Sequence, residues 1–313
     1  MSTLTIPQSA RAVFQDGMEH LAQQKASRFQ KYATVKTGCT GKASAHRRIQ
    51  ATEMTDVTGR IQPTIGEELG LEHRYIFPRK AQKATLIDED DAATLALAVA
   101  PTGDIALQHR MAAGRKIDKI FLDGITGANL EGLEDNMSSL TLPASQTVLA
   151  DYRTDLVVGN TGLNLAKLIR AKGIFGKNEV YGQDQHEEGA HLCMAVSQDE
   201  LNNLLADVEE TGSADYNKVQ ALVDGEVDYF MGIHFIRSEQ IGKRTSPNAG
   251  KIIRSCPMWV STGVYLDFWY DVKTSIDTLP TQSQAIQVYS RIKVGAARKD
   301  EKQVVLVECE QAA

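Results

Sequence analysis

The sequence predicts an α+β protein with two lobes. Apolar residues recur at helical spacing in several separated stretches, whereas the final third, from Met258 to Cys309, has the pattern of successive strands rich in β-branched and aromatic residues. Helices and strands do not alternate in the regular βαβ order of a doubly wound parallel sheet. Apolar residues make up 42% and charged residues 24% of the chain, proportions that are ordinary for a globular domain.

The N-terminal residues predict an amphipathic helix over about 5–31. Thr5-Ile6-Pro7-Gln8 has the pattern of a capping box with an early proline, and apolar side chains from Val13 to Phe29 recur at helical spacing. This stripe precedes any compact domain. Its covering partner is therefore either the chain's own core or a neighbouring molecule.

Residues 32–87 predict short strands that do not form a domain of their own. Thr, Ile and Val are frequent there, glycine and proline interrupt the pattern repeatedly, and large apolar side chains are few. A segment of this length with so little apolar surface cannot build a core. We expect either a long flexible excursion or a two-stranded projection that lies on another molecule.

The clearest helix of the chain is expected at about 104–123. Before it, Asp88-Glu89-Asp90-Asp91 places carboxylates where a helix N-terminus favours them, which predicts a short helix that ends by Pro101. Gly124 and Gly127 are expected to end the longer helix, because glycine tolerates the left-handed conformation. The apolar stripe of this helix consists of Leu107, Met111, Gly114, Ile117, Phe121 and Gly124.

Beyond a linker at about 128–143, helices and strands are mixed. Ser197-Gln198-Asp199-Glu200 has the pattern of a capping box and marks the start of one helix. The expected helices lie at 163–172, 197–207 and 213–223. The expected strands lie at 190–196, 229–236, 259–260, 264–269, 286–294 and 304–307.

No group of residues has the pattern of a catalytic, cofactor-binding or metal site. His186 and His191 are five residues apart, which would place them roughly 140° apart on a helix. The four cysteines are scattered and fit neither a zinc knuckle nor a disulfide framework. No nucleophile elbow, Walker loop or dinucleotide fingerprint occurs. We expect a protein that is not an enzyme, binds no cofactor or metal and keeps its cysteines as reduced core thiols.

Charge and hydropathy restrict the partners. The net charge of -6 repels phosphate, so any contact with DNA is expected to be weak, local and without sequence specificity. The longest mostly apolar run, Ala92 to Ala100, is too short for a membrane span of about 20 residues. The N-terminus lacks the pattern of a secretory signal, which predicts a protein that is made and kept in a cytoplasm.

Basic, aromatic and acidic residues are interleaved between residues 47 and 80. This mixture favours charge pairing across a protein interface over binding to DNA, because acidic side chains would oppose phosphate. The candidate inter-subunit contacts are Arg47, Arg48, Glu67, Glu68, Arg74, Tyr75, Phe77, Arg79 and Lys80.

The order of these parts resembles the Hong Kong 97-type fold of the major capsid (head) proteins of tailed bacteriophages. The stretches that carry the resemblance are 74–91, which begins Arg-Tyr-Ile-Phe-Pro-Arg-Lys, 115–124 with the sequence Arg-Lys-Ile-Asp-Lys-Ile-Phe-Leu-Asp-Gly, and 127–132. The segments 229–237, 257–259, 271–280 and 287–298 resemble the closing segments of phage capsid sequences. The resemblance extends from about residue 30 to 309 and depends on the order of the parts.

The resemblance implies a division of the chain into four parts. These are an N-terminal arm at 1–31, an E-loop at 32–87, a peripheral domain at 88–144 and 256–313 with the spine helix at about 104–123, and an axial domain at 145–255. The implied function is self-assembly, through pentamers and hexamers of the same chain, into an icosahedral head shell around phage double-stranded DNA. A virion location, a two-state shell that matures on DNA entry and no covalent crosslink are expected with it.

The resemblance also implies partners and leaves alternatives. Only about 30 residues precede the expected E-loop, so a separate scaffolding protein is expected, together with a portal and decoration proteins. An encapsulin-like nanocompartment shell, which would hold an enzyme cargo, and a soluble α+β enzyme remain as alternatives, as does a decoration or minor head protein. Neighbouring portal and terminase genes would favour a phage shell.

Overall fold

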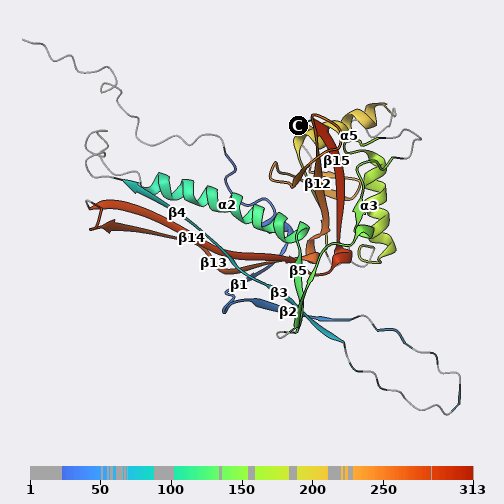
Figure 1. Ribbon diagram of the computed structural model, residues 1–313, viewed down its shortest axis with the longest axis horizontal. Coiled ribbons are helices and arrows are strands. Elements are labelled where there is room, and N and C mark those ends of the chain that lie inside the picture. The colour runs from blue at the N-terminus through green and yellow to red at the C-terminus, as the bar shows by residue number, and fades with distance from the viewer. Residues whose placement is uncertain are drawn as a thin grey trace, which may run out of the picture.

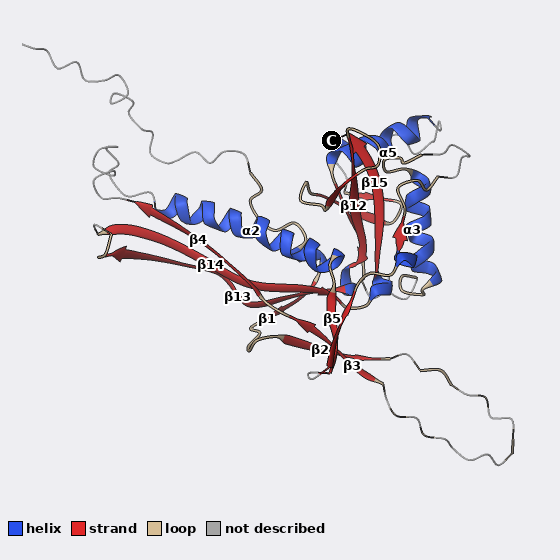
Figure 2. Ribbon diagram, in the orientation of Figure 1, coloured by secondary structure: helices blue, strands red, loops and turns tan. Residues whose placement is uncertain are grey.

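The computed structural model describes residues 23–50, 70–87, 102–133, 136–153, 159–182, 189–210, 228–282 and 284–312, with short pieces of 51–69 and 220–224. These ranges form three sheets in an α+β arrangement with two lobes, as Figure 1 shows. One lobe is elongated and contains the longest helix. The other is rounder and contains shorter helices (Figure 2). One continuous apolar cluster joins both lobes.

The elongated lobe is a four-stranded sheet, which we call the long sheet, with the helix α2 (Thr102–Thr126) along one face. Its strands, in spatial order, are β1 (Thr34–Thr37), β13 (Val264–Leu279), β14 (Ala285–Arg298) and β4 (Arg79–Ile87). The expected helix at 104–123 is therefore confirmed and extends slightly further at both ends. Of its expected apolar stripe, Met111, Ile117 and Phe121 are buried, whereas Leu107 is exposed.

The C-terminal end of α2 differs from the expectation for its glycines. Gly124 lies within the helix, and a Cβ atom there would stand 2.7 Å from the backbone oxygen of Ala296 on β14. Gly127 follows the helix without a left-handed φ, and its N–H donates to the Asp123 oxygen at 2.9 Å. Both glycines are needed for close backbone approach, so the predicted left-handed cap is wrong.

The rounder lobe contains a seven-stranded sheet. Its strands are β7 (Thr147–Val148), β15 (Val304–Ala312), β12 (Lys251–Val260), β8 (Leu192–Val196), β10 (Ile233–Arg237) and β9 (Tyr229–Phe230), with β11 (Lys243–Thr245) paired to β12. The helices α3 (Leu165–Lys177) and α5 (Gln198–Glu210) belong to this lobe. Every residue of β8 is buried, which fits its central position and its uninterrupted apolar sequence.

The strands of the C-terminal region are divided between the two lobes. The strands β13 and β14 do lie in the long sheet, but β12 and β15 pair with each other, and β12 pairs with β8. The reason is that β8 is buried on both faces and needs a hydrogen-bonding partner on each side, which β10 and β12 provide. Residues 251–260 and 304–312 therefore share a sheet with 192–196.

The third sheet, which we call the hairpin sheet, projects below the junction of the two lobes (Figure 1). Its strands, in spatial order, are β2 (Ser44–Ile49), β3 (Leu71–Ile76), β5 (Asn129–Leu133) and β6 (Asn136–Leu140). The expected linker at 128–143 is thus wrong, because β5 and β6 lie in it and pair with the hairpin. The strands at the two ends of the expected E-loop, β1 and β4, belong to the long sheet. Only the segment from about 44 to 76 therefore projects away from that sheet.

The residues before β1 pack on the chain's own core. Residues 23–29 are not helical, and only Gln30–Tyr32 forms a turn of 3₁₀ helix, so the expected helix is wrong over its described C-terminal part. Phe29 is fully buried and stacks on Phe121 at a ring-centroid distance of 5.3 Å. Asp118 accepts hydrogen bonds from Ser27 Oγ at 2.5 Å and from the Arg28 N–H at 3.1 Å. This part of the arm is therefore covered by its own subunit.

Most of the other predicted helices and strands are present in the structure. The helices at 163–172 and 197–207 and the strands at 190–196, 264–269, 286–294 and 304–307 are confirmed, with longer bounds for most of them. The single strand expected at 229–236 is wrong, because Met231 and Gly232, both with positive φ, form a tight turn between β9 and β10. The expected helices at 5–22 and 92–100 and most of the one at 213–223 lie outside the described residues.

The structure agrees with the expected chemistry of the cysteines. Cys39, Cys193, Cys256 and Cys309 are all buried and free. Across the ranges that the structure describes, no three His, Cys, Asp or Glu side chains are grouped as metal ligands would be. No helix in those ranges is long and apolar enough to cross a membrane.

Glu310 is a buried carboxylate that ties the end of β15 to the loops beside it. Its side chain is 2% exposed and accepts hydrogen bonds from Asn160 at 3.1 Å, Asn248 at 2.8 Å, Lys251 at 3.0 Å and Ser246. Burial alone would raise the pKa of Glu310, but the hydrogen bonds from Ser246, Lys251 and the two asparagines outweigh it and lower the pKa to about 2.

Because the pKa of Glu310 is lower in the folded chain than its ordinary value of 4.5, its carboxylate stabilises the fold fully above pH 4.5. That contribution is lost as the pH falls from 4.5 towards 2. We expect Glu310→Gln to lower the free energy of unfolding most at neutral pH and progressively less below pH 4.5. Urea denaturation of the wild type and of Glu310→Gln, between neutral pH and about pH 2, measures this effect, and the exposed Glu68→Gln is a control that should change little. A loss of stability in Glu310→Gln that is the same at every pH would contradict this prediction.

Candidate assembly site

The two faces of the β2–β3 hairpin have different surroundings. In the register of the pair, His46 lies opposite Arg74 and Arg48 opposite Glu72, whereas Ala45 lies opposite Tyr75 and Arg47 opposite His73. Since side chains alternate between faces, the first set shares the inner face and the second set the outer face. The inner face meets the body of the subunit through charged side chains.

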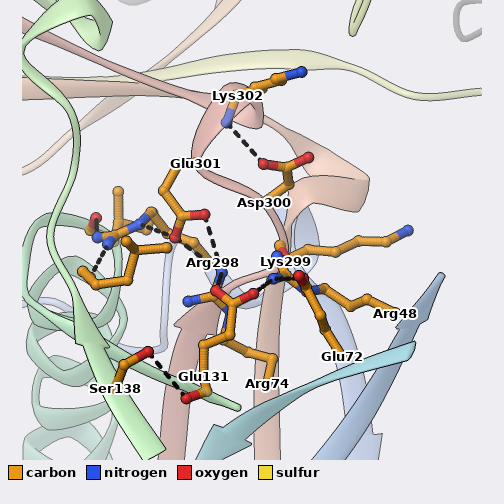
Figure 3. A network of polar contacts seen from close by, with 12 residues as sticks. Arg48, Glu72, Arg74, Glu131, Ser138, Arg298, Lys299, Asp300, Glu301 and Lys302 are labelled. Carbon is orange, nitrogen blue, oxygen red and sulfur yellow. Dashed lines mark hydrogen bonds and ion pairs between the residues drawn. The ribbon is translucent and has the colours of Figure 1, made fainter. Parts of the chain in front are cut away.

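Arg74 is the centre of the inner face and is fully buried. Its Nη2 donates to both carboxylate oxygens of Glu301 at 2.9 and 3.0 Å and lies 3.2 Å from Oε2 of Glu131 (Figure 3). Glu301 stands in the short turn between β14 and β15, and Glu131 on β5. One guanidinium on β3 therefore joins the hairpin to two other segments of the chain.

Two more arginines extend this cluster. Arg48 on β2 contacts Glu72 at 2.9 Å and Glu131, and its Nη1 donates to the backbone oxygen of Lys299 at 2.7 Å. Arg298 lies 3.6 Å from Glu301 and donates to the backbone oxygens of Ile125 at 2.5 Å and Gly127 at 2.6 Å. We call the set Arg48, Glu72, Arg74, Glu131, Arg298 and Glu301 the base network.

The base network joins the hairpin to the C-terminal end of α2. The three arginines and three glutamates balance in charge, and each arginine has at least one carboxylate partner. Arg298 places its positive charge on carbonyls that end α2, where the helix dipole favours a cation. Burial and the hydrogen bond with Glu72 raise the pKa of Glu131, whereas that same hydrogen bond and those from Gln50 and Arg48 lower the pKa of Glu72.

A second set of contacts fixes the hairpin on β13. His46 Nε2 lies 2.7 Å from Oδ2 of the fully buried Asp267, and its ring stacks on Tyr265 at a centroid distance of 4.0 Å. Nearby, Trp269 Nε1 donates to the Gly41 oxygen at 3.0 Å. The base of the hairpin is therefore held by buried polar contacts at several points, which makes it a fixed part of its own subunit.

The outer face of the hairpin sheet is open and partly apolar. Ile49 and Leu71 at its far end are 66% and 51% exposed, and Phe77 is 46% exposed. A hollow of about 840 Å³ lies on this face and is lined by Lys42, Ala43, Ala45, Arg47, His73, Tyr75, Phe77 and Met137. These side chains are available to another molecule.

The predicted contact residues are distributed between the two faces and the long sheet. Arg47, Tyr75 and Phe77 line the outer hollow. Lys80 is exposed on β4, Glu68 is exposed, and Glu67 lies outside the described residues. Arg79 forms an exposed ion pair with Asp123 at 2.6 Å within its own subunit.

One of the predicted contacts needs correction. Arg74 is fully buried in the base network, so the prediction that it touches another subunit is wrong. Arg48 is 15% exposed, and it contacts Glu72, Glu131 and the backbone oxygen of Lys299 within its own chain, whereas a contact with another subunit stays a prediction. The physical reason is that both side chains lie on the inner face of the hairpin, where their charge needs carboxylate partners once water is excluded. The alternation of side chains along the strands 44–49 and 71–76 could have distinguished the residues of the inner face from those of the outer face. No sequence pattern indicated Glu131, Arg298 or Glu301 as their partners.

The comparisons with known proteins agree with this architecture. The family model described as phage capsid protein matches residues 6–311. No curated protein sequence matches the chain. The capsid of Ralstonia phage GP4 has a similar fold, with a TM-score of 0.67 and 11% sequence identity over 100% of this chain and 99% of that one. The capsid subunit of cyanophage Pam1 superposes with a TM-score of 0.64 and 12% identity over 100% of both chains.

A third similar fold is the capsid of a native GTA particle, with a TM-score of 0.60, 13% identity and full coverage of both chains. At these identities the superpositions show a shared fold, and the family match over nearly the whole sequence shows the relationship. The chain therefore belongs to the phage capsid protein family and is a major capsid protein, a structural subunit of the virion shell that encloses the phage DNA.

Proposed function

We propose that the hairpin is the part of this capsid protein that crosses onto a neighbouring subunit, while its base network keeps it fixed in its own. The observation that carries the proposal is the contrast between its two ends. The base is buried and charge-balanced around Arg74, whereas Ile49 and Leu71 at the far end are exposed and have no core of their own. Such a segment adds interface without adding core.

The domain assignments follow with adjusted bounds. The arm at 1–31 is proposed to reach a neighbour only through the residues before Gln23, since 23–32 pack on α2 and the core. The E-loop is proposed to be 44–76 within the expected 32–87. We propose that the long sheet and α2 form the peripheral domain with its spine helix, and that the seven-stranded sheet with α3 and α5 forms the axial domain.

Assembly is proposed to proceed through rings. The axial domains would meet around five-fold and six-fold axes, as pentamers and hexamers of one chain. Contacts of modest size become strong once a ring has closed, because the last ones form within a single assembly. A scaffolding protein, a portal and decoration proteins are the proposed partners, and DNA is held without sequence specificity, consistent with the chain's net charge of -6.

The base network also supports the proposed change from a compact to an expanded shell. Arg298 connects the end of α2 to Glu301, and Glu301 connects to Arg74 on β3. A movement of the hairpin on its neighbour would therefore act on α2 through direct contacts. The two elements are proposed to move together during maturation.

Deleting residues 51–69 and joining the strands by a short turn tests the crossing hairpin. We expect the deletion variant to fold and to remain unassembled, because every contact of the base network lies outside 51–69. Circular dichroism and thermal melting report whether the variant is folded. Sedimentation and electron microscopy, after co-expression with the neighbouring phage genes, report whether shells form. Replacing 51–69 by a Gly/Ser segment of equal length is the matched control for chain length and should also fail to assemble. Normal shells from either variant would contradict the proposal.

A further inference from the structure

The helix α2 has one side that no other described segment covers. The long sheet covers the side of Ile120 and Phe121, which are buried. Residues 23–29 cover a second side, where Asp118 accepts hydrogen bonds from this part of the arm. The side that remains open carries, at the spacing of one helical face, Gln108, Ala112, Arg115, Lys116 and Lys119.

This open side of α2 is strongly basic. Lys116 and Lys119 are exposed. Arg115 donates to the side-chain oxygen of Gln23 at 2.7 Å, and this neutral partner leaves the charge of the guanidinium unbalanced. The helix therefore presents three positive charges within about one and a half turns.

Lys83 of β4 adds a fourth positive charge beside α2. It is exposed and lies opposite Ser290 of β14, so both side chains point to the sheet face that α2 covers. The Ser290 hydroxyl is accordingly 3.2 Å from His109 on α2. Burial and the nearby charge of Lys83 lower the pKa of His109. We call the four basic residues Lys83, Arg115, Lys116 and Lys119 the cationic strip.

A hollow of about 460 Å³ separates α2 from β4 beside the cationic strip. The two elements are joined by Thr85 and His109 at 2.8 Å and, further along, by the ion pair of Arg79 with Asp123 at 2.6 Å. The hollow is lined by two lysines of the strip and by small side chains, among them Lys83, Lys116, Ala81, Ala112 and Ala113. An anionic group can therefore approach both ammonium groups from solvent.

No carboxylate neutralises the cationic strip within the ranges that the structure describes, where none of its four members forms an ion pair. The two carboxylates nearest to it along α2 have other partners. Asp118 accepts hydrogen bonds from the arm, and Asp123 pairs with Arg79. The strip is therefore a local positive surface on a chain whose net charge is -6.

The composition of the strip favours a nucleic acid over a protein as its occupant. Lysine is depleted at protein interfaces, which are enriched in aromatic residues and methionine. The open side of α2 carries no large apolar side chain, and the exposed Leu107 lies on the side of the arm, beside Ser27. A basic strip along a helix is the electrostatic footprint of a nucleic-acid contact. The polyanion that a capsid protein encloses is the phage DNA.

We propose that the cationic strip faces the inside of the shell and contacts the phosphates of the packaged double-stranded DNA. This inference rests on the proposed function, in which the shell holds DNA without sequence specificity, and it adds the surface that does so and the orientation of α2. Lysine binds phosphate as a point charge, so the strip reads no bases. Each phosphate contact releases counterions, and the attraction therefore weakens as salt rises.

DNA binding by the unassembled subunit tests the strip directly. The strip variant carries Lys116→Gln and Lys119→Gln, and the control carries Lys177→Gln and Lys243→Gln, two exposed lysines of the rounder lobe with the same change in net charge. Fluorescence anisotropy of a short labelled duplex measures the affinity across a series of salt concentrations. We expect the strip variant to bind at least about tenfold more weakly than the wild type at low salt.

The dependence on salt gives a second readout of the same experiment. The slope of log affinity against log salt should be less steep in the strip variant by roughly 1.8, since each of two lost phosphate contacts contributes about 0.9. The control should keep the affinity and the slope of the wild type. Equal binding by the strip variant and the control, or a wild type that binds no DNA at low salt, would overturn the inference.

Cryo-electron microscopy of heads made by co-expression with the neighbouring phage genes tests the orientation. We expect α2 on the inner surface with DNA density against it, and the strip variant should form as many shells as the control but a smaller share of filled ones. A strip on the outer surface would overturn the inference. A folded strip variant that forms few shells would also overturn it, in favour of a protein contact. A wild type that forms no shells would contradict the proposed function, whereas the affinity of the strip for DNA is measured separately on the subunit.

Discussion

Arg74→Ala is expected to destabilise the subunit by about 3–5 kcal/mol, because it removes the buried cation between two carboxylates. Glu301 and Glu131 keep only 12% and 14% of their side-chain surface exposed and would lose a partner at 2.9 and 3.2 Å. Arg298 and Arg48 remain nearby, but both already donate to backbone oxygens. The hairpin would also lose its link to α2, so shell formation should fall with stability.

Urea denaturation of the unassembled subunit measures this effect. Arg47→Ala is the matched control, since Arg47 neighbours Arg48 in sequence but lies on the outer face and is exposed. Its substitution should change the free energy of unfolding by no more than about 0.5 kcal/mol. Equal stability of the two variants would show that Arg74 is not the centre of the base network.

Trp259→Ala is expected to cost about 3–5 kcal/mol, through the cavity that it leaves where the two lobes share a core. The Trp259 side chain is fully buried, and its ring contacts Phe29 at 5.8 Å and Phe121 at 5.4 Å between centroids. Its Nε1 donates to the Tyr32 oxygen at 2.9 Å, so the substitution also leaves a backbone acceptor unpaired. The start of the chain, α2 and β12 would all lose packing at once.

The effect of Trp259→Ala should appear as a lower melting temperature of the subunit and as protease cleavage near residues 23–32. Tyr229→Ala is a suitable control, because its ring is 49% exposed at the edge of the seven-stranded sheet. A melting temperature like that of the control would contradict the assignment of Trp259 to the shared core.

The sequence predicted the elements whose signal is local. The stripe of α2 and the capping box at Ser197 are examples, and in the structure the Ser197 N–H donates to Glu200 at 2.8 Å. The strands after Val264 could also be predicted, because a long run of β-branched residues indicates a strand whichever segment pairs with it. The resemblance to phage capsid proteins supplied the family, which the family match over 6–311 confirms.

Pairing between distant segments could not be predicted in the same way. The strand β5 has a sequence typical of a loop, Asn-Leu-Glu-Gly-Leu, and becomes a strand because β3 offers it a hydrogen-bonding edge. The partners of Arg74 come from positions 131 and 301, whose proximity depends on the complete fold. The sequence leaves open what covers Phe29, because the two rings that pack against it, Phe121 and Trp259, lie far along the chain.

Cryo-electron microscopy of the chain co-expressed with the genes beside it tests the central claim most directly. The account predicts closed icosahedral shells in which every hairpin, at residues 44–76, extends over an adjacent subunit while its base remains on its own long sheet. Shells whose hairpins fold back on their own subunits, or particles that never close, would contradict it.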